Sequence, residues 1–225
     1  MSAKLQPIRV CLLAFDMMDL MDFGGPLETL SHARNESRHR LFSVQVAAST
    51  PEINTVQGLV IHRDTTWDEA QNSLETYDVL VVPGSNYATT VEHCKPEDPI
   101  IRLIEQFSAL PARAAASPRV LLSICSASFF LATAGILAGR RATTHYFILK
   151  PLEAHCENHG RTEVVRKRFV DAGLLPNGAR VVTSGGITSG FDATLYVVEL
   201  LAGTSCAEKA SNAMDYPWNK LEGLF

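Results

Sequence analysis

Short apolar runs rich in β-branched residues alternate with segments of helical periodicity along most of this chain. Val79–Val82 is the clearest run, and Ile8–Phe15, Phe42–Ala48 and Arg180–Thr183 repeat the pattern. Between such runs, segments like Ile100–Leu110 carry apolar residues at helical spacing. Buried strands joined through helices form a mostly parallel sheet that is covered on both faces. The pattern therefore predicts an α/β fold, with its chemistry gathered at the carboxyl ends of the strands.

The other expected elements complete this alternation. We expect further strands at Leu59–His62, Arg119–Ile124, Thr162–Val165 and Phe169–Asp171, and helices around Pro26–Ala33 and at Ser126–Ala134, Phe147–Cys156, Ala193–Leu201 and Ala207–Met214. The small-residue stretch Ala112–Ser117 predicts a surface connection. Because no repeat or low-complexity linker divides the chain, we expect one domain over residues 1–225, with its core at about 8–201 and a C-terminal helix at 205–216.

Composition narrows the function classes. The chain has 225 residues, of which 46% are hydrophobic and 20% charged, as in ordinary globular proteins. A net charge of −4 argues against a general nucleic-acid binder. No apolar run approaches the length of a membrane span, and the first residues do not form the apolar core of a signal peptide. We therefore expect a cytoplasmic protein that binds neither nucleic acid nor membranes.

The cysteines suit a reducing compartment. The chain has five, an odd number, and no pair shows CxxC spacing. This pattern indicates neither a disulfide framework nor a zinc site, so a thiol can stay free for chemistry.

Cys125 occupies the position that is most informative about function. It directly follows the apolar run Arg119–Ile124, and the expected helix Ser126–Ala134 follows it. A cysteine between a buried strand and a helix resembles a nucleophile elbow, in which free amides and the helix dipole stabilise a thiolate. The alternative is a small buried hydrophobic residue without a chemical role.

Two other strand ends are expected to meet Cys125. The first strand runs into Asp16–Pro26, which supplies carboxylates, a flexible glycine pair and a proline suited to a helix start. Val79–Val82 runs into Pro83–Asn86, a glycine-containing turn that exposes amide donors. A thiol, a carboxylate and amide donors can together support nucleophilic addition to a polar multiple bond.

Each of these features also has a structural interpretation. Asp19 or Asp22 could simply cap a helix, Gly84 could be a turn residue, and His145 could be a core or loop residue. The basic cluster Arg166–Arg168 is interpreted as a solvated strand or turn rather than a phosphate site.

The segment Ser184–Gly190 superficially resembles a phosphate cradle. It lacks the spacing of the dinucleotide and P-loop motifs, so we do not expect nucleotide binding.

The order of motifs resembles the ThiJ/PfpI superfamily from about Ile8 to Leu201. The motifs that carry this resemblance are Asp22–Pro26, Val81–Ser85, Ser123–Ala127, Ala134–His145 and Gly186–Asp192. The resemblance implies a flavodoxin-like three-layer sandwich of the class I glutamine-amidotransferase type, with a mostly parallel sheet, helices on both faces and a cysteine nucleophile elbow. The last two motifs are similar to those of isonitrile hydratase-like members and of amidase-like domains attached to some transcription regulators.

The resemblance also implies roles for individual residues. Cys125 matches the reactive elbow cysteine, and Asp22 matches the acidic residue that hydrogen-bonds it. Ser85 stands where the family usually has the second glycine of a Pro-Gly-Gly loop, whose amide points at the reacting group. Ser126 stands where hydratase-like members usually have Thr and where peptidase- or deglycase-like members often have His.

We expect Ser126 to act with Cys125 and Asp22 in catalysis, and expect oxyanion and substrate binding from Gly84, Ser85, His145 and Thr188. Because Ser126 is not His, a Cys-His pair at the elbow is absent, which counts against a peptidase-type mechanism. A glyoxalase-type mechanism could still use His145. Relative to glycine, the serine at position 85 either narrows the pocket or requires a backbone conformation that serine tolerates.

By resemblance, the expected activity is hydration of a small isonitrile to an N-substituted formamide by a lyase that needs neither metal nor organic cofactor. Two alternatives stay open at this point. One is glyoxalase- or deglycase-type activity on 2-oxoaldehydes, and the other is a non-enzymatic redox-sensing or chaperone-like protein whose Cys125 is oxidised.

The resemblance to the superfamily also implies a homodimer. The apolar entry to the first helix, with Met17, Met18, Leu20 and Met21, could pack against the partner or could equally be core or pocket lining.

Overall fold

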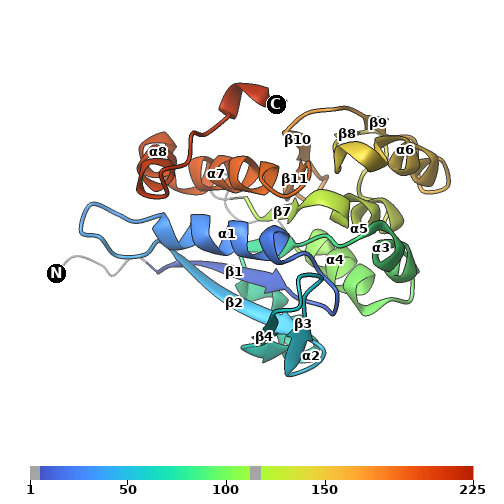
Figure 1. Ribbon diagram of the computed structural model, residues 1–225, viewed down its shortest axis with the longest axis horizontal. Coiled ribbons are helices and arrows are strands. Elements are labelled where there is room, and N and C mark those ends of the chain that lie inside the picture. Colours follow the sequence, from blue (N-terminus) through green and yellow to red (C-terminus); the bar gives the residue numbers. More distant parts are fainter. Residues whose placement is uncertain (1–5, 112–117, 225) are drawn as a thin grey trace.

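The computed structural model describes residues 6–111 and 118–224, and its centre is an eight-stranded sheet (Figure 1). The strand order is β12-β10-β11-β7-β6-β1-β2-β5, and all neighbours run parallel except β10 and β11. The strands are β1 (Ile8–Leu13), β2 (Phe42–Ala48), β5 (Thr65–Thr66), β6 (Val79–Val82), β7 (Val120–Ser123), β10 (Phe169–Leu174), β11 (Arg180–Ser184) and β12 (Gly223–Leu224).

Two short pairs lie outside this sheet. A hairpin joins β3 (Glu52–Asn54) to β4 (Val60–His62), and β8 (Arg141–Ala142) pairs in parallel with β9 (Glu163–Val164).

The helices form two packed groups that flank the sheet (Figure 1). One group contains α1 (Leu20–His32), α7 (Ser189–Ala202) and α8 (Thr204–Ala213), and the other contains α3 (Tyr87–His93), α4 (Pro99–Ala109), α5 (Ser128–Thr133) and α6 (Leu149–Glu157). The short α2 (Trp67–Asn72) follows β5, and the 3₁₀ turns are Leu74–Thr76, Cys125–Ala127, Tyr146–Ile148 and Lys220–Glu222. None of the helices in the described residues is both long and apolar enough to cross a membrane.

The central strands explain why their sequences show no alternation of polar and apolar residues. Every residue of β6 and β7 is buried, because helices cover both faces of a parallel sheet. The register pairs Val82 of β6 with Ser123 of β7, and Val81 with Leu12 of β1. The carboxyl ends of these three strands therefore meet at one edge, as the sequence led us to expect.

The first helix differs from its expected position. It begins at Leu20, so Pro26 lies inside it and not at its start. The reason is the cap: the Asp19 side chain accepts hydrogen bonds from the amides of Met21 and Asp22, and this fixes the first turn ahead of the proline.

The sequence analysis did not predict helices α2 and α3. One predicted segment cannot be compared with the structure. Thr66 and Glu69 form a capping box at α2, and Asn86 caps α3; both are signals that the sequence carried. The surface connection expected at Ala112–Ser117 lies outside the described residues.

Candidate active site

Cys125 lies at the turn between β7 and α5, in a strained backbone conformation. Its φ of 56° is in the left-handed region, which costs a non-glycine residue energy and persists only where neighbours hold it. Here the Cys125 amide donates to the Gly185 carbonyl at 3.2 Å, and its own carbonyl accepts from the Thr144 hydroxyl at 2.8 Å. The side chain is buried, with 7% of the residue exposed. This is the geometry of a nucleophile elbow.

Asp22 lies in the first turn of α1 and is fully buried. Asp19, not Asp22, caps the helix, so the capping interpretation of Asp22 is wrong. Within the described part of the chain, neither carboxylate oxygen of Asp22 has a partner that meets both the distance and the angle limits of a hydrogen bond. Its polar contacts are the Cys125 thiol and the backbone amides of Gly84 and Ile187. A buried carboxyl with so few partners is costly unless it keeps its proton.

The protonation of this pair follows from its burial. Desolvation, together with the Asp19 carboxylate, raises the pKa of Asp22 to about 7, against the opposing effect of the Cys125 thiol and the backbone amides of Ile187 and Gly84. Desolvation and the Asp22 carboxylate also raise the pKa of Cys125 above its ordinary value, although the Ser126 amide lowers it. An ionised Asp22 beside the thiol therefore disfavours the thiolate. Transfer of the thiol proton to Asp22 would remove this penalty and keep the proton within the pair.

Gly84 leaves room for this pair of side chains. A Cβ at this position would lie 2.8 Å from the Asp22 Oδ2 and 2.7 Å from the Ser126 Oγ. Both distances are shorter than side chains tolerate, so a larger residue would displace the carboxyl or the elbow. Gly84 is therefore required for close approach of the β6 loop, and its carbonyl also accepts from the Asp19 amide at 2.9 Å.

Ser85 and Ser126 differ from the roles that the sequence suggested. The Ser85 amide donates to the Ser126 Oγ at 2.9 Å, so it is not aimed at the reacting group. The same hydroxyl contacts the Ser85 carbonyl at 2.9 Å and the Thr90 hydroxyl at 2.7 Å, and Ser126 is fully buried. Ser126 therefore fastens the β6 loop to the elbow and has no exposed atom to offer a substrate. The Ser85 hydroxyl donates to the Met17 carbonyl, which fixes the loop after β1 as well.

A cavity of about 290 Å³ opens above Cys125. Ser85 and His145 line it, as expected, together with Asp19, Val56, Asn86, Tyr87, Phe147, Ile148 and Ile187. Most of this wall is apolar. The lining residues with polar side chains are Asp19, Ser85, Asn86, Tyr87, Cys125 and His145. Burial lowers the pKa of His145, so its ring is neutral at neutral pH and can accept or donate a hydrogen bond.

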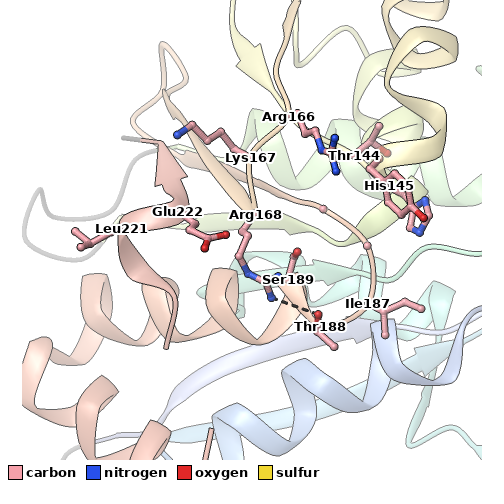
Figure 2. A pocket seen from close by; sticks show the side chains of 13 residues that line it. Thr144, His145, Arg166, Lys167, Arg168, Ile187, Thr188, Ser189, Leu221 and Glu222 are labelled. Atoms are coloured by element: carbon pink, nitrogen blue, oxygen red, sulfur yellow. Dashed lines mark hydrogen bonds between the residues drawn. The ribbon is translucent and has the colours of Figure 1, made fainter. Parts of the chain in front are cut away.

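Thr188 does not line this cavity. Its hydroxyl accepts from the Arg168 Nη2 at 3.3 Å, and Thr188 lines a different cavity (Figure 2). The reason is Ile187, whose φ of 46° turns the chain so that its own side chain lines the Cys125 cavity. A β-branched residue in this conformation is a true outlier, which no sequence signal indicated.

Sequence reasoning therefore identified Cys125 and Asp22, whose side chains the structure brings into contact, and missed part of the structure that holds them. Asp19 was noted as a cap and also lines the cavity, whereas Ile187 and Thr90 had no recognisable signal. In the described residues, no group of His, Cys, Asp and Glu side chains is arranged to hold a metal ion.

The fold and site define a parallel α/β protein with a cysteine at a nucleophile elbow and a buried carboxyl beside it. Comparison with known families agrees: residues 8–200 match the DJ-1/PfpI family, and the chain belongs to that family. The ThiJ/PfpI resemblance and the α/β fold that it implied are thus confirmed.

Two curated relatives narrow the comparison. An isonitrile hydratase from Pseudomonas putida is 28% identical over 213 residues, which covers 93% of this chain and 78% of that protein. An uncharacterized protein from the cpoL 5′ region of Streptomyces lividans is 31% identical over 150 residues, or 67% of this chain and 96% of that protein.

Solved structures show the same fold. A ThiJ/PfpI family protein from Pseudomonas syringae has a TM-score of 0.72 at 22% identity, over 95% of this chain and 78% of that one. DJ-1 of Schizosaccharomyces pombe has a TM-score of 0.70 at 16% identity, over 93% of this chain and 100% of that one.

Proposed function

We propose that this protein hydrates a small isonitrile to the corresponding N-substituted formamide, with Cys125 as nucleophile and Asp22 as general acid and base. The single observation that carries the proposal is the buried Asp22 carboxyl, which contacts the thiol and has a pKa of about 7. A group with this pKa can both deliver and accept a proton near neutral pH. The relative that is named as an isonitrile hydratase supports the same reaction.

The proposed reaction begins with proton transfer within the pair. The thiol proton moves to Asp22, and the sulfur attacks the terminal isonitrile carbon to form a carbon–sulfur bond. Asp22 then delivers its proton to that carbon, which gives a thioimidate. The isonitrile carbon is both electrophilic and, after attack, basic, so one residue that gives up and regains a proton suits it.

Water completes the proposed cycle. Asp22, now ionised, takes a proton from a water molecule that adds to the thioimidate carbon, and passes this proton to the nitrogen. The carbon–sulfur bond then breaks and the electron pair returns to sulfur. The hydroxyl proton passes through Asp22 to the sulfur as the carbonyl forms, and the formamide leaves. The Asp19 carboxylate and the neutral His145 ring line the cavity and are the groups that can hold this water. The Ser126 hydroxyl and the Ser85 amide, which are hydrogen-bonded to each other, act as positioning groups that hold the β6 loop against the elbow.

The cavity wall indicates the substituent on the isonitrile nitrogen. Val56, Phe147, Ile148 and Ile187 present hydrocarbon surface near Cys125. Such a wall stabilises an apolar chain or ring by roughly 25 cal/mol per Å² of buried area. The narrow volume favours a small or slender group next to the reacting carbon.

The test is turnover of a panel of alkyl and aryl isonitriles, with formamide followed by mass spectrometry. We expect formamide to form with the native enzyme and not with Cys125→Ala. Methylglyoxal is assayed beside the panel, because a Cys125-dependent loss of methylglyoxal without isonitrile turnover would replace this proposal with a glyoxalase-type activity. If neither substrate is consumed while Cys125 oxidises readily, the sensor alternative takes its place.

A further inference from the structure

A second, larger cavity of about 660 Å³ lies beside the Cys125 cavity, and the reaction does not use it (Figure 2). Its wall brings together two sequence segments that we had separately set aside, the basic cluster Arg166–Arg168 and the glycine-rich turn at 185–189. Its volume is in the range of ligand sites in proteins. Sequence alone could not show that the two segments face each other.

Arg168 is held rigidly at this cavity. Its Nε donates to the fully buried Asp192, and its Nη2 contacts the hydroxyls of Tyr216 at 3.2 Å and Thr188 at 3.3 Å. Within the described residues, its Nη1 has no hydrogen-bond partner, and neither does the Ser189 hydroxyl on the same wall. A preorganised guanidinium with an unused donor pair matches the geometry of a carboxylate or phosphate.

The other charges leave this cavity positive. Asp192 neutralises Arg168, and Glu222 on the opposite wall supplies one negative charge. Arg166 stacks over the Tyr146 ring at 5.6 Å, and Lys167 lines the rim. In the part of the chain that the structure describes, no carboxylate forms an ion pair with either of these two cations. The excess charge therefore favours an anionic ligand.

The two cavities share the side chains of His145 and Ile187 in their walls. The two cavities are therefore neighbours, with these two residues between them. We propose that the basic cavity binds a carboxylate or phosphate at the far end of the substrate whose reactive end meets Cys125. This inference rests on the proposed function for the reactive end, and it names the substrate class as an anionic, elongated isonitrile.

The first experiment measures binding without catalysis. The Cys125→Ser protein is titrated with inorganic phosphate and with acetate by NMR, following amides of the 185–189 turn. We expect Arg166→Gln with Lys167→Gln to weaken binding by about tenfold or more, and Glu222→Gln to tighten it, because these changes alter the charge in opposite directions. Arg161→Gln, a matched arginine outside this cavity, should change nothing. Absence of binding, or equal weakening by Arg161→Gln, overturns the site.

The second experiment tests the link to Cys125 and does not depend on isonitrile turnover. Alkylation of the Cys125 thiol is timed with a length series of ω-bromoalkanoates, ω-bromoalkyl phosphates and the matching neutral amides. The sulfur displaces bromide in each case, so only the remote group differs. We expect the anion-to-amide rate ratio to peak at one chain length and to fall to about 1 in the Arg166→Gln, Lys167→Gln protein.

Each result has a distinct meaning. A flat ratio at every length overturns the link, even if free phosphate binds. A peak with carboxylates alone or with phosphates alone identifies which anion the cavity selects. A peak in the anion-to-amide rate ratio, without isonitrile turnover, supports the anion-binding cavity and contradicts the hydratase proposal.

Discussion

Replacing Asp22 by Asn should raise the stability of the protein at neutral pH while removing most of its turnover. The pKa of Asp22 is raised in the folded state to about 7 from 3.8, so the folded protein binds the carboxyl proton more tightly than the unfolded chain does. Stability that depends on this proton is present at low pH and is lost as pH rises towards 7. The shift corresponds to a ceiling of about 4 kcal/mol at neutral pH and above.

The asparagine amide has nearly the same shape and does not ionise, so it escapes this loss. We expect Asp22→Asn to match the native protein in free energy of unfolding near pH 4. At pH 8 it should be more stable by on the order of 1–4 kcal/mol, the lower values arising because Cys125 shares the proton. Turnover should fall by on the order of 10²-fold or more, the scale of a positioned general acid and base.

The assay is urea unfolding at several pH values together with turnover, and the matched control is Asp19→Asn. Asparagine caps a helix as well as aspartate does, so that variant should keep its stability. Its Asp22 pKa should fall slightly, because the Asp19 carboxylate contributes to the shift. A pH-independent stability difference for Asp22→Asn, or full activity, would refute the assignment of a shared proton.

Three further predictions concern the same region. Gly84→Ala should leave the fold intact and abolish Cys125-dependent turnover, since the new methyl group would lie 2.8 Å from the Asp22 Oδ2; circular dichroism and turnover check this. Limiting iodoacetamide should label Cys125 before the other four cysteines, because Asp22 can accept the thiol proton within the pair and the cavity admits the reagent, even though burial also raises the Cys125 pKa; mass spectrometry locates the label. Light scattering should give a dimer mass, which Met21→Glu lowers to that of a monomer; a monomer in the native protein removes the dimer proposal.

The dimer prediction gains one refinement from the structure. Of the methionines at the entry to α1, Met18 is fully buried, whereas Met17 and Met21 are 43% and 41% exposed. The core interpretation therefore holds for Met18, and only the other two are available to a partner. An exposed pair of large apolar side chains is the kind of surface that an interface covers.

Sequence reasoning succeeded where the physical signal is local. The run at Val79–Val82 coincides with a strand because burial on both faces requires continuous apolar residues, and the run at Phe42–Ala48 coincides with a strand whose last three residues are buried. Cys125 could be placed at an elbow because the strand before it and the helix after it each have a clear pattern. The pairing of Asp22 with Cys125 came from family resemblance, and the structure brings the two together.

The failures have a common cause, which is competition between partners that lie far apart in sequence. Ser126 looked like a group for the substrate, yet Ser85 and Thr90 use its hydroxyl from more than thirty positions away. Thr188 looked like part of the Cys125 site, yet Arg168 takes its hydroxyl. A single sequence shows which groups can form hydrogen bonds and does not show which of several acceptors or donors each one meets.

Three of the five described non-glycine residues with positive φ lie in segments around the Cys125 sulfur atom. Met17, Cys125 and Ile187 all have positive φ, and each belongs to a segment that borders the cavity. Asp22, with no full hydrogen bond, lies at the centre of the same region. Each strained residue costs on the order of 1–3 kcal/mol, and such residues persist where surrounding structure holds them and function requires them. The hydroxyl of Ser126 and the close approach at Gly84 supply that support. Relaxing any one of these features should therefore stabilise the chain and slow its chemistry, which is the relation that Asp22→Asn tests most directly.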